Sequence, residues 1–171
     1  MQQSSVPETS PTSVVREGLV TGLLGGVAVA LWFLLIDALR GQPLFTPAAL
    51  GSALFGGARS PAEVEMSVAT VGVYTIVHFA AFFAIGILAS AFALASRSEP
   101  RLVLGMALVF VTLETLALGT FAILAAWLLG TLQVWTILVA NAIAAVAMGL
   151  YLWRHNPALR AAVDAPVEER V

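Results

Sequence analysis

Long apolar stretches alternate with short polar segments along the chain. The apolar stretches cover about residues 18–39, 68–95, 102–129 and 134–153, and with their flanking residues they predict helices over about 17–39, 61–96, 101–129 and 133–154. At about 1.5 Å per residue, each is long enough to cross a hydrocarbon core of about 30 Å as a helix. The pattern therefore predicts an all-α fold, an integral membrane four-helix bundle over residues 16–155.

The two ends of the chain lack this pattern. Residues 1–15 are rich in Ser, Thr, Pro and Gln, which predicts a disordered N-terminal tail. Residues 156–171 mix charges of both signs and form a predicted C-terminal cytoplasmic tail. Polar residues, Asp37 and Arg40, stand at the end of the first stretch, where a secretory signal would have a small-residue cleavage site. We therefore expect the first helix to remain uncleaved.

The connection after the first stretch contains two helix-start signals. Thr46–Pro47 places a capping hydroxyl before a proline, which predicts a short interfacial helix over residues 48–55. Residues 60–63 read Ser-Pro-Ala-Glu, a capping box around a proline at the first helical position. We expect a helix to begin there and to continue unbroken into the second apolar stretch.

The distribution of arginine predicts the orientation in the membrane. With four spans, six arginines lie on the side of the two termini and two lie on the long first connection: Arg16, Arg97, Arg101, Arg154, Arg160 and Arg170 against Arg40 and Arg59. Under the positive-inside rule this favours cytoplasmic termini (N-in/C-in) in the inner (plasma) membrane of a bacterium.

Composition excludes several classes of function. Apolar residues make up 60% of the chain and charged residues 11%, and there is no cysteine. Thiolate metal ligands and cysteine nucleophiles are therefore excluded. A formal net charge of -2 without a basic stripe argues against nucleic-acid binding. Because no hydrolase, metalloprotease or phosphate-loop motif occurs, the sequence favours a non-enzymatic protein and predicts no catalytic residue.

Small residues recur at helical spacing in the first stretch, at Gly18, Gly22, Gly26 and Ala30. Such a stripe lets two helix backbones approach closely in lipid. The partner is either another helix of this chain, which we favour, or a second copy. Asp37 lies 11 positions beyond Gly26, so at about 100° per residue it returns to the same face at the outer rim of the membrane.

Polar residues within the apolar stretches are candidate functional groups, because they are costly in lipid. His78 and Glu114 lie at the same expected depth, about 18 Å from the inner edge. Asn141 reaches a similar level, and Tyr74 lies one turn from His78. The four predict a buried polar layer. Such a layer could hold the helices together by hydrogen bonds, handle protons or ions, or bind a ligand or metal.

The sequence does not identify a cofactor. One buried histidine with one glutamate falls short of the di-iron bundle pattern, and the second histidine, His155, is expected at the opposite membrane edge. No metal site is predicted, and haem ligation by His78 alone is left open.

The segment from Trp32 to Gly51, with Asp37, Gln42–Pro43 and Thr46–Pro47 within it, resembles small uncharacterised bacterial inner-membrane proteins of similar length. The resemblance covers the first helix and part of the connection after it. It implies the four-helix fold but no activity, and it marks Asp37 as a residue of interest.

Three hypotheses about function follow. The leading one is a non-enzymatic accessory subunit of a membrane complex, or a homo-oligomer, whose partners are the lipid bilayer, other membrane subunits or further copies of the chain. The second is a small proton-coupled transporter or channel that uses Glu114 and His78. The third is a membrane bundle that binds a lipid, quinone, haem or metal.

Overall fold

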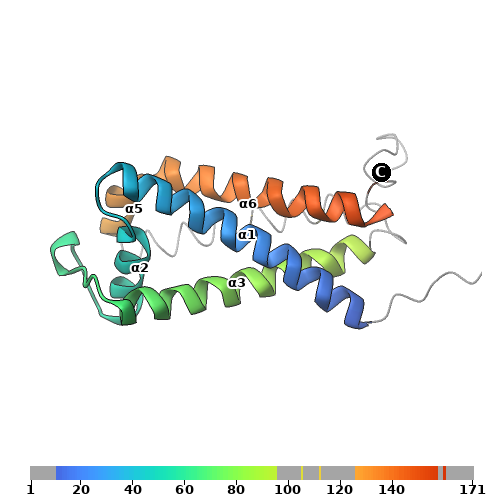
Figure 1. Ribbon diagram of the computed structural model, residues 1–171, viewed down its shortest axis with the longest axis horizontal. Coiled ribbons are helices and arrows are strands. Elements are labelled where there is room, and N and C mark those ends of the chain that lie inside the picture. Colours follow the sequence, from blue (N-terminus) through green and yellow to red (C-terminus); the bar gives the residue numbers. More distant parts are fainter. Residues whose placement is uncertain (1–10, 96–104, 106–111, 113–125, 158–159, 161–171) are drawn as a thin grey trace, which may run out of the picture.

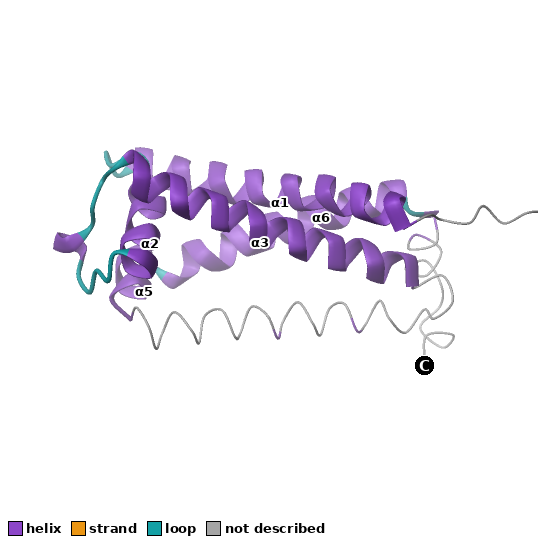
Figure 2. Ribbon diagram, turned by 90° about the horizontal axis from the view of Figure 1, so that it is seen from below, coloured by secondary structure: helices purple, strands orange, loops and turns teal. Residues whose placement is uncertain are grey.

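The computed structural model describes residues 11–95, 105, 112, 126–157 and 160, and all regular structure in them is helical. In this described part of the chain there are three long helices, and two short helices and a 3₁₀ turn lie at one end of them (Figures 1 and 2). The elements are α1 (Pro11–Leu39), α2 (Phe45–Phe55), the 3₁₀ turn η1 (Pro61–Glu63), α3 (Val68–Ala95), α5 (Ala126–Leu132) and α6 (Val134–His155).

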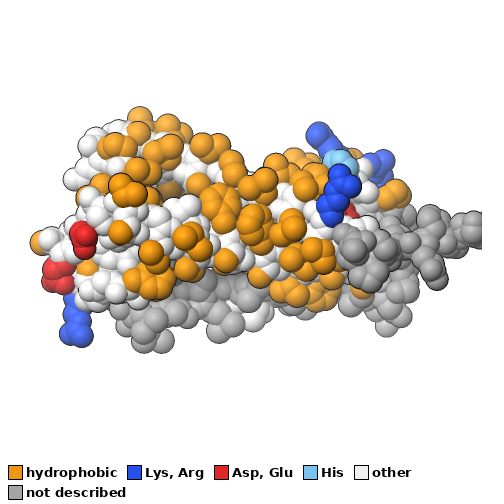
Figure 3. Space-filling model, turned by 60° about the horizontal axis from the view of Figure 1, so that its bottom comes forward, with side chains coloured by type: hydrophobic (Ala, Val, Ile, Leu, Met, Phe, Trp, Pro, Cys, Tyr) orange, Lys and Arg blue, Asp and Glu red, His pale blue; other side chains and the backbone are white. Residues whose placement is uncertain are grey.

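The long helices fit an integral membrane protein. Ser13–Leu39, Val68–Ala95 and Val134–His155 are each long and apolar enough to cross a membrane. Figure 3 shows charged side chains at the two ends of one face and a hydrophobic surface between them. The predicted stretch at 101–129 lies largely outside the described residues, so the fourth helix of the expected bundle stays a prediction.

Glycines bring α1 and α3 into backbone contact where they cross. A Cβ atom on Gly86 of α3 would overlap the carbonyl oxygen of Gly18 and the nitrogen of Gly22, and it would lie 2.8 Å from the Gly22 Cα. A Cβ on Gly22 would in turn overlap the Phe82 carbonyl. The stripe on α1 thus faces another helix of the same chain. From this crossing the two helices diverge toward the end that carries α2 (Figure 1).

Helix α6 packs along α1 on small residues and one indole. Ala140 and Ala144 of α6 form a buried cluster with Val29 of α1. The Trp32 Nε1–H donates to the Thr136 carbonyl at 2.9 Å, which ties the last turns of α1 to the first turn of α6.

Helix α2 is short but well buried. Ala48 and Ala49 are both 0% exposed, and a Cβ on Gly51 would press on the backbone of Thr70 at the start of α3. Ala49 and Leu50 also form an apolar cluster with Leu128 and Leu132 of α5. Helix α2 ends at Phe55, as expected. It is held between α3 and α5 at the end of the bundle.

The expected continuous helix from residue 61 is wrong. Residues 61–63 form only the single turn η1, in which the Ser60 side chain does not cap the turn, and α3 begins at Val68. A second capping serine explains the break, because the Ser67 hydroxyl accepts the Thr70 amide at 3.1 Å and starts α3 there. At the other end of the molecule, α1 begins at Pro11, earlier than the expected residue 17.

The η1 turn predicts a small pH effect. The Arg59 amide and the Ser60 hydroxyl both donate to the Glu63 carboxylate, at 2.9 Å each, and these bonds lower the pKa of Glu63 below its ordinary value. Because the folded pKa is depressed, the turn keeps its full stability above the ordinary glutamate pKa and loses it as pH falls through the lower, folded value. In an NMR titration the Arg59 amide shift should follow this protonation, and Ser60→Ala should move the midpoint upward. An unchanged midpoint in Ser60→Ala would contradict this interpretation.

Candidate functional site

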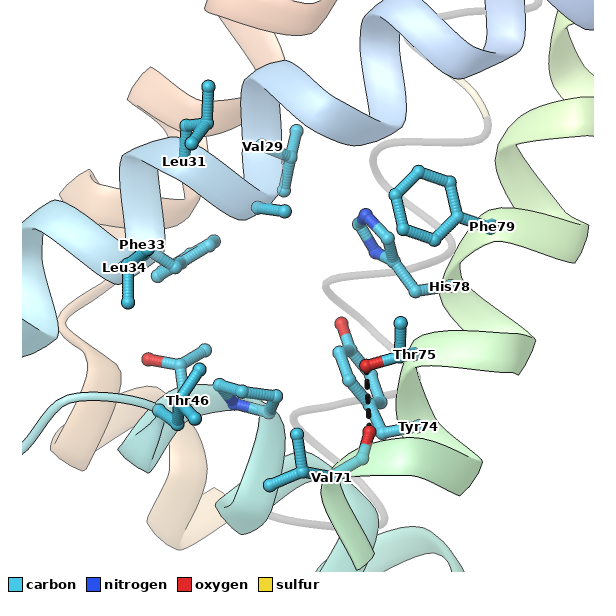
Figure 4. A pocket seen from close by; sticks show the side chains of 13 residues that line it. Val29, Leu31, Phe33, Leu34, Thr46, Val71, Tyr74, Thr75, His78 and Phe79 are labelled. Atoms are coloured by element: carbon cyan, nitrogen blue, oxygen red, sulfur yellow. Dashed lines mark hydrogen bonds between the residues drawn. The ribbon is translucent and has the colours of Figure 1, made fainter. Parts of the chain in front are cut away.

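A cavity of about 170 Å³ lies between α1, α2 and α3. It occupies the space where α1 and α3 diverge from their glycine crossing, and α2 closes it at the end of the bundle (Figure 4). It is lined by Val29, Ala30, Leu31, Phe33 and Leu34 of α1, Leu44, Thr46 and Pro47 at α2, and Val71, Tyr74, Thr75, His78 and Phe79 of α3.

The cavity opens toward the side of the bundle. Ala30, Leu31, Leu34 and Thr75 all line it and are themselves exposed. In a membrane this side faces lipid, so a molecule dissolved in the bilayer can reach the cavity without passing through water.

His78 provides one polar group on the α3 wall. Its Nε2 lies 3.0 Å from the carbonyl oxygen of Gly26 on α1. Since a carbonyl can only accept, Nε2 carries the proton, and in the neutral ring Nδ1 is a bare acceptor. Gly26 has no side chain to cover this carbonyl, and a Cβ there would lie 3.0 Å from the Phe79 ring. The bond joins α1 and α3 at mid-helix and fixes the imidazole in one orientation.

Tyr74 provides the second polar group, one turn before His78. The two rings have centroids 5.8 Å apart, and both side chains point from α3 toward the cavity (Figure 4). Among the residues that the structure describes, the Tyr74 hydroxyl has no hydrogen-bond partner. The neighbouring hydroxyl of Thr75 is already used, because it donates to the Val71 carbonyl at 2.7 Å.

Asp37 anchors the α2 wall of the cavity. It is 1% exposed, and its carboxyl oxygens accept the Thr46 amide at 2.7 Å and the Thr46 hydroxyl at 2.8 Å. The remaining amides of the first turn are also paired, since Phe45 donates to Gln42, Ala48 donates to Leu44 and Pro47 has no N–H. Asp37 therefore caps a helix that begins eight positions later, and it holds Thr46 against the cavity.

The structure brings together part of the expected polar layer. Tyr74 and His78 share the cavity, whereas Asn141 lies half-buried on α6 and is not among the described residues that line it. Glu114 lies outside the described residues. Ala30, expected to pack with the glycines, is exposed at the mouth of the cavity instead.

Sequence reasoning missed the aromatic and aliphatic walls. Phe33, Val71 and Phe79 line the cavity, but each is one of many apolar residues in a spanning helix, so no local signal distinguishes them. In the sequence, Thr46 is recognisable only as a helix cap. Asp37 and Thr46 are polar residues on either side of a short connection, so a bond between them could have been expected.

Metal ligation has no support in the described part of the chain, where no group of three His, Cys, Asp or Glu side chains lies close enough to hold an ion. The second histidine, His155, stacks on Tyr151 in the last turn of α6, with ring centroids 4.3 Å apart. It belongs to a different helix and to the opposite end of the bundle from the cavity.

The fold and the cavity fit a helical membrane protein with a side-opening cavity between its helices. No protein-family model, no curated protein and no solved structure matches this chain.

Proposed function

We propose that this chain is a non-enzymatic, polytopic inner-membrane protein that binds a small lipid-soluble molecule in the α1–α2–α3 cavity. The observation that carries the proposal is a preformed, mostly apolar cavity, open at the side of the bundle, with two fixed polar groups on one wall. Ligand sites are typically concave and apolar with a few placed polar groups. A cavity of about 150 Å³ in a protein core is enough to bind benzene, so this one accommodates a single ring.

The proposal includes four spans with both termini cytoplasmic. The beginning of α1 and the end of α6 lie at one end of the molecule, and α3 also ends there (Figure 1). Helix α5 lies at the opposite end of the molecule from the end of α3, an arrangement that supports the proposed fourth span. The excess of arginine near the termini supports the N-in/C-in orientation.

The other two hypotheses stay predictions. The glycine stripe that suggested self-association faces α3 of the same chain, so an accessory-subunit or homo-oligomeric role would have to use a different surface. The transporter hypothesis depends on Glu114, which lies outside the described residues. Ligand binding is favoured because Tyr74 and His78 lie together on the wall of one cavity.

Toluene, a ring without polar atoms, tests the proposal. In detergent-solubilised protein with ¹³C-labelled methyl groups, we expect toluene to shift the resonances of Val29 and Val71, which line the cavity. Val146, exposed on α6, reports general partition into the micelle and should shift much less.

Two matched substitutions locate the binding. Ala30→Phe places a ring at the mouth of the cavity and should abolish the Val29 and Val71 shifts. Ala142→Phe adds the same ring to an exposed position of α6 outside the cavity lining and should leave the shifts intact. Equal shifts at Val29, Val71 and Val146, or binding undiminished by Ala30→Phe, would overturn the proposal.

A further inference from the structure

The two polar groups of the cavity offer complementary hydrogen-bonding roles. Because the Nε2–H of His78 is committed to Gly26, the Nδ1 of the neutral ring can only accept. The Tyr74 hydroxyl can donate, and within the described chain it has no partner. A ligand that satisfies both must present an O–H or N–H to His78 and an acceptor to Tyr74. A hydroxyl group does both at once.

The walls around these groups suit a flat ring. Phe33 faces the cavity from α1, and Tyr74, His78 and Phe79 face it from α3. The His78 ring is itself held between aromatic neighbours, with its centroid 5.3 Å from that of Phe79 and 4.8 Å from that of Phe82. Aromatic side chains favour offset or edge-to-face contacts with a bound ring. A saturated acyl chain would fill the volume but leave both polar groups unpaired, which is unfavourable away from water.

We propose that the cavity binds a hydroxyl-bearing ring of the phenol or quinol class, with the ring hydroxyl donating to His78 Nδ1 and accepting from Tyr74. This inference rests on the proposed ligand-binding function and adds the chemical class of the ligand. A quinol satisfies both groups, whereas the corresponding quinone has only acceptors and leaves His78 Nδ1 unpaired. The site therefore discriminates between the two oxidation states and prefers the reduced one.

Three ring compounds of similar size test the inference: toluene, methyl-1,4-benzoquinone and methylhydroquinone. Titrations are followed at the Val29 and Val71 methyls under anaerobic conditions, and affinities are referred to the measured concentration of each compound in the micelle. The chain has no cysteine, so thiol addition to the quinone does not interfere. In the wild type we expect methylhydroquinone to bind about tenfold more tightly than the quinone, the effect of one additional buried hydrogen bond.

Three variants assign the effect to the two side chains. His78→Phe should abolish the preference for the reduced compound. His78→Gln should retain it, because one amide group can donate to the Gly26 carbonyl and also accept from the ligand. Tyr74→Phe should weaken quinone binding to the level of toluene. His78→Gln and Tyr74→Phe keep the test decisive if His78→Phe fails to fold.

The outcomes separate the inference from the function on which it rests. Equal affinities for quinol and quinone, or tighter binding of the quinone, would overturn the phenol and quinol assignment while toluene binding still upheld the cavity as a ligand site. If none of the three compounds shifts the Val29 and Val71 methyls, the proposed function itself is wrong.

Discussion

Gly86→Ala should destabilise the protein strongly. The new Cβ would overlap the Gly18 carbonyl oxygen and the Gly22 nitrogen, and neither backbone atom can move away without separating α1 from α3. Overpacking of this kind costs about 1–3 kcal/mol and occasionally more, and we expect about 3 kcal/mol here because the obstructing atoms are backbone. A thermal melt of the detergent-solubilised protein, followed by circular dichroism, measures the loss.

Gly149→Ala is the matched control. Gly149 lies on α6, and a Cβ there meets nothing within 4 Å, so the same chemical change should leave the melting temperature unchanged or raise it slightly. Similar melting temperatures for Gly86→Ala and Gly149→Ala would contradict the backbone contact between α1 and α3.

Asp37→Ala should have the second large effect. It removes both acceptors of Thr46 and leaves an amide and a hydroxyl unpaired in a buried site. Each unpaired buried group costs about 1–3 kcal/mol, partly offset by no longer burying a carboxyl group, so we expect a loss of about 3 kcal/mol. The first turn of α2 should loosen, and hydrogen exchange at Thr46 should accelerate most.

Asp37→Asn separates hydrogen bonding from side-chain size. Its amide oxygen can accept the Thr46 N–H and its amide nitrogen can donate to the Thr46 hydroxyl, so we expect a loss of only about 1 kcal/mol. If Asp37→Ala proved as stable as Asp37→Asn, the carboxyl group would not be the cap of α2.

For the first helix, residue spacing alone predicts part of the packing. The glycine interval of four predicted one closely packed face on α1, and the same arithmetic placed Asp37 on that side. The spacing could not show that Gly86, one of the two glycines in α3, completes the contact. Nor could it show that Ala30 lies beyond the crossing, where the helices have already diverged.

The cavity could be predicted only in part, for a different reason. Tyr74 and His78 were placed on one face of a helix by their separation of four residues. However, the partner of His78 is the backbone carbonyl of Gly26, and a carbonyl leaves no signature in the sequence. The matching depths therefore point to side-chain partners, Glu114 and Asn141, and give no sign that a glycine exposes an acceptor at the right height.

The connection after α1 was the hardest part to predict. The capping-box pattern at residues 60–63 predicts the start of a helix, yet such a pattern describes only the first turn. Whether a helix continues depends on the residues that follow, and Ser67 begins a new one. The burial of α2 likewise depends on packing against α5, which is distant in sequence.

The location of a bound ring is the most direct test of the account. A crystal structure of the protein soaked with 4-bromotoluene would place the ligand by the anomalous signal of bromine. We expect the principal peak between α1, α2 and α3, in contact with Val71 and Phe79, and its loss in Ala30→Phe. A principal peak on the outer surface of the bundle, with the cavity empty, would contradict the assignment of this cavity as the functional site.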